Sequence, residues 1–232
     1  MFETLTIYFA KKPVPCFAVI ITLLPLTLIF VRKAYLDPSF KLLVFYLLLK
    51  FAIDIFMVHS AALQKNNIIY YNLSIPLYYC LISGMFYYKL SEAYPRKIVA
   101  YSMLVFSSFC IWEIFNANSN IRDLYNHRAV LYSKTIEGVL IISWILLYFY
   151  ELIKSLRIPN LLTFPFFWVC SGLLLYYSSF IFIAPALHYT ATWSGSLDLG
   201  VTRIIPYIFE ILSAIMFSVG IYHFSAADYA KQ

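Results

Sequence analysis

Six ionisable side chains lie inside long apolar stretches of the sequence, and they are the residues best able to do chemistry: Lys50, Asp54, Lys134, Glu137, Arg203 and Glu210. Their formal charges balance, with three basic and three acidic groups. A charged side chain at the centre of a membrane helix costs roughly 2.5–3.5 kcal/mol on insertion scales. Such groups persist where they are paired, hydrated or functional. Carboxylates beside ammonium groups can bind an ion or a small polar ligand.

The spacing of these groups places them in pairs on single helix faces. Lys50 and Asp54 are four residues apart, so they share one face. The other two pairs, three and seven residues apart, are Lys134 with Glu137 and Arg203 with Glu210. Lys50 lies about eight residues into its segment, or about 12 Å at 1.5 Å per residue, so its side chain reaches the membrane surface only in part. The side chain of Lys134 is expected to reach the surface.

Polar residues at a similar depth on other helices extend this set. We expect a polar pocket that opens to the outside of the membrane and has aromatic walls. The predicted pocket residues are Lys50, Asp54, Asn72, Tyr79, Glu113, Glu137, Arg203, Tyr207 and Glu210, with helix kinks at Pro76 and Pro206. The same charges are also explained if they only pair across helices and fix their packing. On the sequence alone, both interpretations stay open.

The composition indicates an integral membrane protein. Of the 232 residues, 62% are hydrophobic and only 12% are charged, whereas a soluble domain is about 25% charged. The net charge of +6 includes no basic run, so we exclude nucleic acid as a partner. Seven apolar segments each approach the roughly 20 residues that span a bilayer. They predict an all-α bundle of seven transmembrane helices in a single domain, 1–232, at about 16–31, 42–62, 69–88, 98–115, 131–152, 161–185 and 204–221.

The basic residues of the connecting segments predict the orientation. Nine Lys and Arg residues fall on one side of the seven segments and five on the other. Cytoplasmic loops carry the excess of Lys and Arg. We therefore expect the N-terminus outside and the C-terminus in the cytoplasm, in a plasma membrane of the bacterial inner-membrane type.

A weak internal repeat accompanies this plan. The segment SIPLYYCLISGMF resembles IIPYIFEILSAIMF, with Pro76 matching Pro206 and Ser83 matching Ser213. This suggests two three-helix units joined by the fourth helix, a three-plus-one-plus-three plan. In helix count, orientation and plan the chain resembles the broad group of seven-helix transporters, opsins and receptors. The resemblance rests on architecture alone, because the seventh segment has no lysine for a retinal Schiff base and the chain has no Pro-Gln pair.

Three classes of function fit these features. The first is a receptor or sensor that binds a small ligand or ion in the outward pocket and signals through a cytoplasmic or membrane partner. The second is a small-solute or proton-coupled transporter, and the third is a membrane-embedded lipid-modifying enzyme. The receptor is favoured because the polar groups concentrate in the outer half. We expect no catalytic residues, cofactor or metal, since no H-x-x-x-H, Gly-rich phosphate loop or G-x-S-x-G motif occurs. The oligomeric state is left open.

Overall fold

The computed structural model describes residues 8–118, 126–155, 161–192 and 204–225. In this part of the chain every regular element is helical and no strand occurs. The helices are α2 (Pro13–Ile21), α3 (Leu23–Val31), α4 (Pro38–Ala62), α5 (Ile68–Lys89), α6 (Ala93–Ala117), α7 (Leu131–Ser155), α8 (Pro165–Thr192) and α9 (Ile205–Tyr222). Residues 8–11 are also helical. The predicted all-α fold is confirmed.

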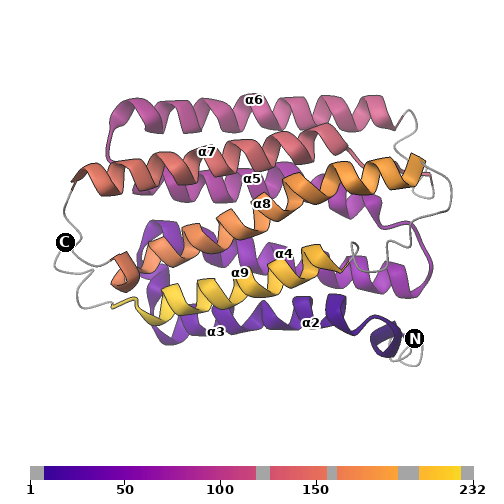
Figure 1. Cartoon of the computed structure of the whole chain (residues 1–232), viewed down its shortest axis with the longest axis horizontal. Helices are drawn as coiled ribbons and strands as arrows, with labels where there is room; N and C mark the ends of the chain where they lie inside the picture. The colour runs from indigo at the N-terminus through magenta and orange to yellow at the C-terminus, as the bar shows by residue number, and fades with distance from the viewer. Residues whose placement is uncertain (1–7, 119–125, 156–160, 193–203, 226–232) are drawn as a thin grey trace.

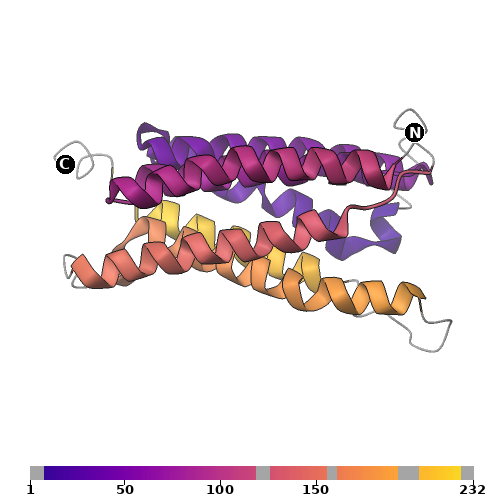
Figure 2. The ribbon, with the colours of Figure 1, turned by 90° about the horizontal axis from the view of Figure 1, so that it is seen from above.

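The helices run lengthwise beside one another in a single bundle, from α6 at one edge to α2 and α3 at the opposite edge (Figure 1). A quarter turn of the view separates them into two layers, with α6 in one and α7 and α8 in the other (Figure 2). Helices α4, α6 and α7 have 25 residues each and α8 has 28, or about 37–42 Å at 1.5 Å per residue, which exceeds the roughly 30 Å hydrocarbon core of a bilayer.

Six stretches among the described residues are long and apolar enough to cross a membrane: Pro13–Val31, Pro38–Ala62, Ala93–Ala117, Leu131–Lys154, Pro165–Ile183 and Ile205–Tyr222. They indicate a membrane-embedded helical protein. The outer face of α6 supports this, because Leu104, Val105 and Trp112 are exposed there, as lipid-facing side chains are. Helix α5 is not among the six stretches, although it has 22 residues. Its six tyrosines and its Asn and Ser residues lower its mean hydropathy.

Prolines mark the start of several helices. A proline lies in the first turn of α2, α4 and α9, and Pro165 is the first residue of α8. The missing N–H group costs nothing at these positions, because the first N–H groups of a helix have no partner within it. At α4 the carboxylate of Asp37 also accepts a hydrogen bond of 2.8 Å from the Ser39 N–H. The sixth predicted segment therefore begins at 165 rather than 161, after a short 3-10 turn, Leu161–Thr163.

The interior kinks differ from those predicted. Pro76 does lie inside a helix, α5. Pro206 lies in the first turn of α9, so the interior kink expected there is not found in the described helix, which begins at Ile205. A helix break does occur at Thr22, between α2 and α3. Pro25 explains it, because its missing N–H group would have bonded the carbonyl of Ile21.

Aromatic side chains fill the end of the bundle farthest from the start of α2 and α9. We call five of them the aromatic cluster: Phe40, Phe86, Tyr148, Phe166 and Phe224, whose neighbouring ring centroids are 5.2–6.3 Å apart. The ammonium group of Lys89 lies over two of these rings and 2.5 Å from the carboxylate of Asp37. All five rings are buried, so this half of the bundle is densely packed.

Helices α8 and α9 pack closely, with no room for a side chain at two glycines. A Cβ atom on Gly220 would lie 2.5 Å from the carbonyl oxygen of Pro165, and one on Gly172 would lie 2.9 Å from the ring of Phe217. Contacts this close, one with a backbone oxygen and one with a buried ring, leave little freedom for one helix to slide over the other. A displacement of α9 is therefore expected to move α8 with it.

Candidate functional site

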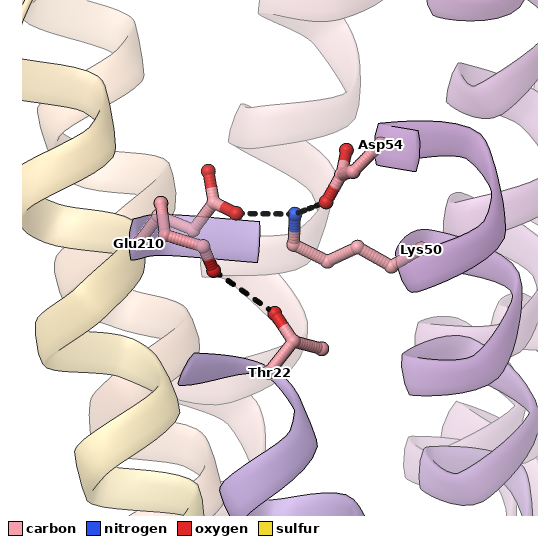
Figure 3. Close-up of polar contacts among 5 residues, drawn as sticks. Thr22, Lys50, Asp54 and Glu210 are labelled. Carbon is pink, nitrogen blue, oxygen red and sulfur yellow. Dashed lines mark hydrogen bonds and ion pairs between the residues drawn. The ribbon is translucent and has the colours of Figure 1, made fainter. Parts of the chain in front are cut away.

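Three charged side chains meet where α4 faces α9. The ammonium Nζ of Lys50 lies 2.5 Å from Oδ2 of Asp54, one turn away on α4, and 2.5 Å from Oε1 of Glu210 on α9 (Figure 3). We call these three residues the charged triad. The side chain of Lys50 is only 10% exposed. The predicted proximity of Lys50 and Asp54 is confirmed, and Glu210 is added from 160 residues away in sequence.

The charges of the triad do not balance. One ammonium group faces two carboxylates, which leaves a formal charge of −1 in a mostly buried place. The two bonded oxygens lie within about 5 Å of each other, since each is 2.5 Å from the same nitrogen, and like charges at that distance repel. The triad is therefore suited to receive a further positive charge.

A cavity of about 670 Å³ opens beside the triad. It lies at the end of the bundle where α2 and α9 begin and α4 ends, and its walls come from residues 8–15 and from α4, α5, α7, α8 and α9. All three triad residues line it, together with the aromatic rings of Tyr71, Tyr78, Tyr176, Phe180 and Tyr207. This volume is typical of sites for small organic ligands.

The space continues only slightly beyond the triad. A void of about 10 Å³ lies there, bordered by the hydroxyl-bearing side chains of Thr22, Tyr46 and Ser213. It is near the minimum needed to hold a single water molecule. The hydroxyl of Thr22 donates a hydrogen bond of 3.2 Å to the carbonyl of Ala18, at the break between α2 and α3 (Figure 3). The triad thus forms the floor of the cavity.

A second buried pair lies on the opposite wall. Nζ of Lys134 is 2.7 Å from Oε2 of Glu137, and the hydroxyl of Tyr177 donates a bond of 2.9 Å to Oε1 of the same carboxylate. Glu137 is fully buried. Lys134 lines the cavity and its ammonium lies 5.1 Å from the ring centre of Phe180. The ammonium group of Lys134, which was expected at the membrane surface, is enclosed by aromatic rings of α8 beside the cavity.

Two predicted pocket residues instead hold the bundle end together. Asn72 donates to the carbonyl of Arg128 at 2.8 Å and accepts from the N–H of Val130 at 3.1 Å. Glu113 accepts hydrogen bonds from the backbone N–H groups that begin α7 and from the hydroxyl of Ser133. Neither residue lines the cavity. Both satisfy backbone groups that would otherwise be left without partners at a helix start.

The remaining predicted residues have different outcomes. Tyr79 is buried deeper between helices, where its hydroxyl pairs with Ser102 at 2.7 Å and accepts from the indole of Trp144 at 3.3 Å. Tyr207 does line the cavity. Arg203 lies outside the described residues. Of the predicted set, the structure therefore brings four residues to the cavity: Lys50, Asp54, Tyr207 and Glu210.

Sequence reasoning missed two contributions to the cavity. Lys11 and Lys12, just before α2, are exposed at its rim, although they were counted only as topology signals. Tyr78 lines the cavity, and its hydroxyl is buried without a hydrogen-bond partner among the described residues. Only the period of α5, which places Tyr71, Ser74 and Tyr78 on one face, could have indicated this wall.

The described residues contain no group of three or more His, Cys, Asp or Glu side chains placed to hold a metal ion. Comparison of the chain with protein-family models, curated proteins and solved structures gives no significant match. The fold and cavity define a helical membrane protein with a charged cavity at one end of its bundle. Its function must be inferred from the chemistry of that cavity.

Proposed function

We propose that this protein is a seven-helix membrane receptor or sensor, which binds a small ligand in the cavity and signals through a partner protein. The charged triad carries the proposal. Buried charges in a membrane protein are costly, and they are usually kept at ligand, ion or proton sites. Here they line a cavity of ligand size and connect α4 with α9, so a bound ligand can act on the contact between two helices.

The proposal takes α5 as the seventh span. Its 22 residues are enough to cross a bilayer, and it packs between α4, α6 and α7 within the bundle (Figure 1). Its polar residues are tolerated because they face protein: Asn72, Ser74 and Ser83 are all buried. Seven spans put the two ends of the chain on opposite sides. The excess of basic residues then favours an outside N-terminus and an outward cavity, in the plasma membrane.

The packing beyond the triad favours a receptor over a carrier. Ten residues separate Lys50 from Phe40 along α4, or about 15 Å at 1.5 Å per residue. The aromatic cluster fills that half of the bundle. A carrier needs a second route to the opposite face, and the described cavities do not continue past the void of about 10 Å³. A cavity closed at its floor fits binding better than passage.

Helix α9 gives the binding site a mechanical connection to the opposite end. Glu210 contacts the triad near the start of this helix, and near its end the ring of Tyr222 lies 4.5 Å from the guanidinium of Arg32, which follows α3. A ligand shifts a conformational equilibrium only if it binds the two states differently. A ligand that draws Glu210 away from Lys50 does so, because the Lys50–Glu210 ion pair is the one that joins α4 to α9.

Cysteine labelling from each face tests the proposal. The four native cysteines, free in the structure, are replaced by alanine, and a single cysteine is placed at Met57 in the cavity wall or, as the control, at buried Leu43 below the triad. A membrane-impermeant maleimide is expected to label position 57 from outside only, and position 43 from neither face. Labelling of 57 from both faces would favour the transporter. Protection of 57 from both faces would leave no water-filled pocket and refute the proposal.

A further inference from the structure

The cavity carries opposite charges at its two ends. Its floor has the triad, with one ammonium group for two carboxylates. Its rim has Lys11 and Lys12, for which no carboxylate among the described residues lies within ion-pair distance. The floor therefore favours a cation and the rim an anion.

An unpaired hydroxyl on the wall indicates that the cavity has an unfilled polar contact. Tyr78 is only 9% exposed, and its hydroxyl has no hydrogen-bond partner among the described residues. Burying a hydroxyl without a partner is unfavourable. Tyr78 lines the cavity beside the triad, and its hydroxyl is covered in this structure, so a polar group of a ligand supplies the missing bond when the tyrosine side chain turns toward the cavity. This observation is independent of the charges.

From these features we infer that the ligand is a small zwitterion of short-peptide length, with its ammonium group at Asp54 and Glu210 and its carboxylate at Lys11 and Lys12. The inference rests on the proposed function, since it names the ligand of that site. The second acidic group of the triad is then explained, because the ligand's ammonium restores charge balance at the floor. The aromatic ring of Tyr176 on the cavity wall then contacts the body of the ligand.

The distance between the two ends sets the length. Thr22 borders the void below Lys50, and Lys12 lies ten residues nearer the rim, or about 15 Å at 1.5 Å per residue. The rim lysines have long side chains that reach part of the way toward the floor, so a ligand of about 10 Å, the span of an extended tripeptide, suits this separation. A free amino acid is shorter and is expected to bind more weakly.

The probes are the tripeptide Ala-Phe-Ala, its C-terminal amide and its N-acetyl form. The three share the same tripeptide and differ in which end is charged; the acetylated form is also longer by one acetyl group. Binding to the purified full chain is measured by the thermal shift of unfolding and by isothermal calorimetry. We expect the zwitterion to bind at least tenfold more tightly than the amide, and the acetylated form to show no binding. Free phenylalanine is the length control and is expected to bind more weakly than the tripeptide.

Variants test which residues bind the ammonium end and the carboxylate end of the peptide. Asp54→Asn is expected to weaken binding of the zwitterion and of the amide alike, by tenfold or more. The double variant Lys11→Ala, Lys12→Ala is expected to remove only the tighter binding of the zwitterion relative to the amide. Glu92→Gln and Lys33→Ala at the opposite end are the matched controls and should leave binding unchanged. Equal binding of zwitterion and amide, tighter binding of the acetylated form, or no binding by any probe overturns the inference. The peptide experiments test only the identity of the ligand. The receptor proposal is tested separately, by whether position 57 is labelled from one face of the membrane.

Discussion

Replacement of Lys50 by methionine is the sharpest test of the charged triad. The variant keeps the length of the side chain but leaves Asp54 and Glu210 without their shared cation. Two carboxylates within about 5 Å repel by about 3–4 kcal/mol at an effective dielectric constant of about 20. Removing one partner of a buried ion pair costs about 3–5 kcal/mol in measured cases. We expect a loss of that size in the free energy of unfolding.

The assay is the unfolding temperature of the purified protein. The amount of monodisperse protein in size-exclusion chromatography is the second readout. A loss of 3–5 kcal/mol corresponds to roughly 6–20 °C for a chain of this size. Adding Asp54→Asn should recover part of the loss, and adding Glu210→Gln as well should recover most of it, because no unpaired charge then remains. Lys154→Met is the control: its side chain is 62% exposed and pairs with Glu92 only at 3.7 Å, so little change is expected.

Two results would refute this reasoning. An unfolding temperature of Lys50→Met equal to that of the parent would show that the triad does not bear on stability. A triple variant no more stable than Lys50→Met would show that the lost lysine matters for its packing and not for its charge.

A separate expectation concerns Asp54→Asn alone. It relieves the repulsion and leaves Lys50 with Glu210, so the empty protein should be as stable as the parent or gain about 1 kcal/mol.

Three further predictions concern contacts outside the triad, and each is read from the unfolding temperature. Glu113→Ala removes the acceptor that caps the start of α7 and should cost about 1–2 kcal/mol; an unchanged temperature would deny the capping role. Gly220→Ala sets a Cβ 2.5 Å from a backbone oxygen of α8 and should cost about 1–3 kcal/mol, whereas Gly138→Ala, 3.2 Å from a flexible side chain, should cost less. Tyr177→Phe removes a donor to buried Glu137 and should cost about 1–2 kcal/mol; a gain would show that this bond is strained.

The sequence predicts the helices well because each one leaves a local signal. Apolar runs of bilayer length indicate where helices lie, and prolines and polar residues mark where they start. The predicted 131–152 and 204–221 differ from α7 and α9 by at most three residues at any end. The errors in the predicted helices also have local causes. Pro206 was read as an interior kink because its position in the first turn of α9 depends on where that helix begins.

The site is less predictable because its contacts join residues far apart in the chain. Lys50 and Asp54 share a helix face, so their pairing follows from their spacing. Glu210 joins them only because the folded bundle brings α9 opposite α4, and the sequence has no signal for that. Glu113 shows the opposite error: a carboxylate at the end of α6 has the depth of a pocket residue, but the start of α7 lies beside it and supplies backbone donors. The depth of a carboxylate along its helix therefore does not distinguish a pocket residue from a residue that caps a neighbouring helix.

The contrast between the two buried charge groups separates packing from binding. Lys134 and Glu137 balance one another, and Tyr177 satisfies a further carboxylate oxygen, so this pair is complete and is explained by helix packing. The triad also joins two helices, but a single carboxylate would suffice for that. Its second acid adds repulsion and desolvation with no gain in packing. It lies where a cavity of about 670 Å³ reaches it, so its cost is explained if a positively charged ligand group completes the triad.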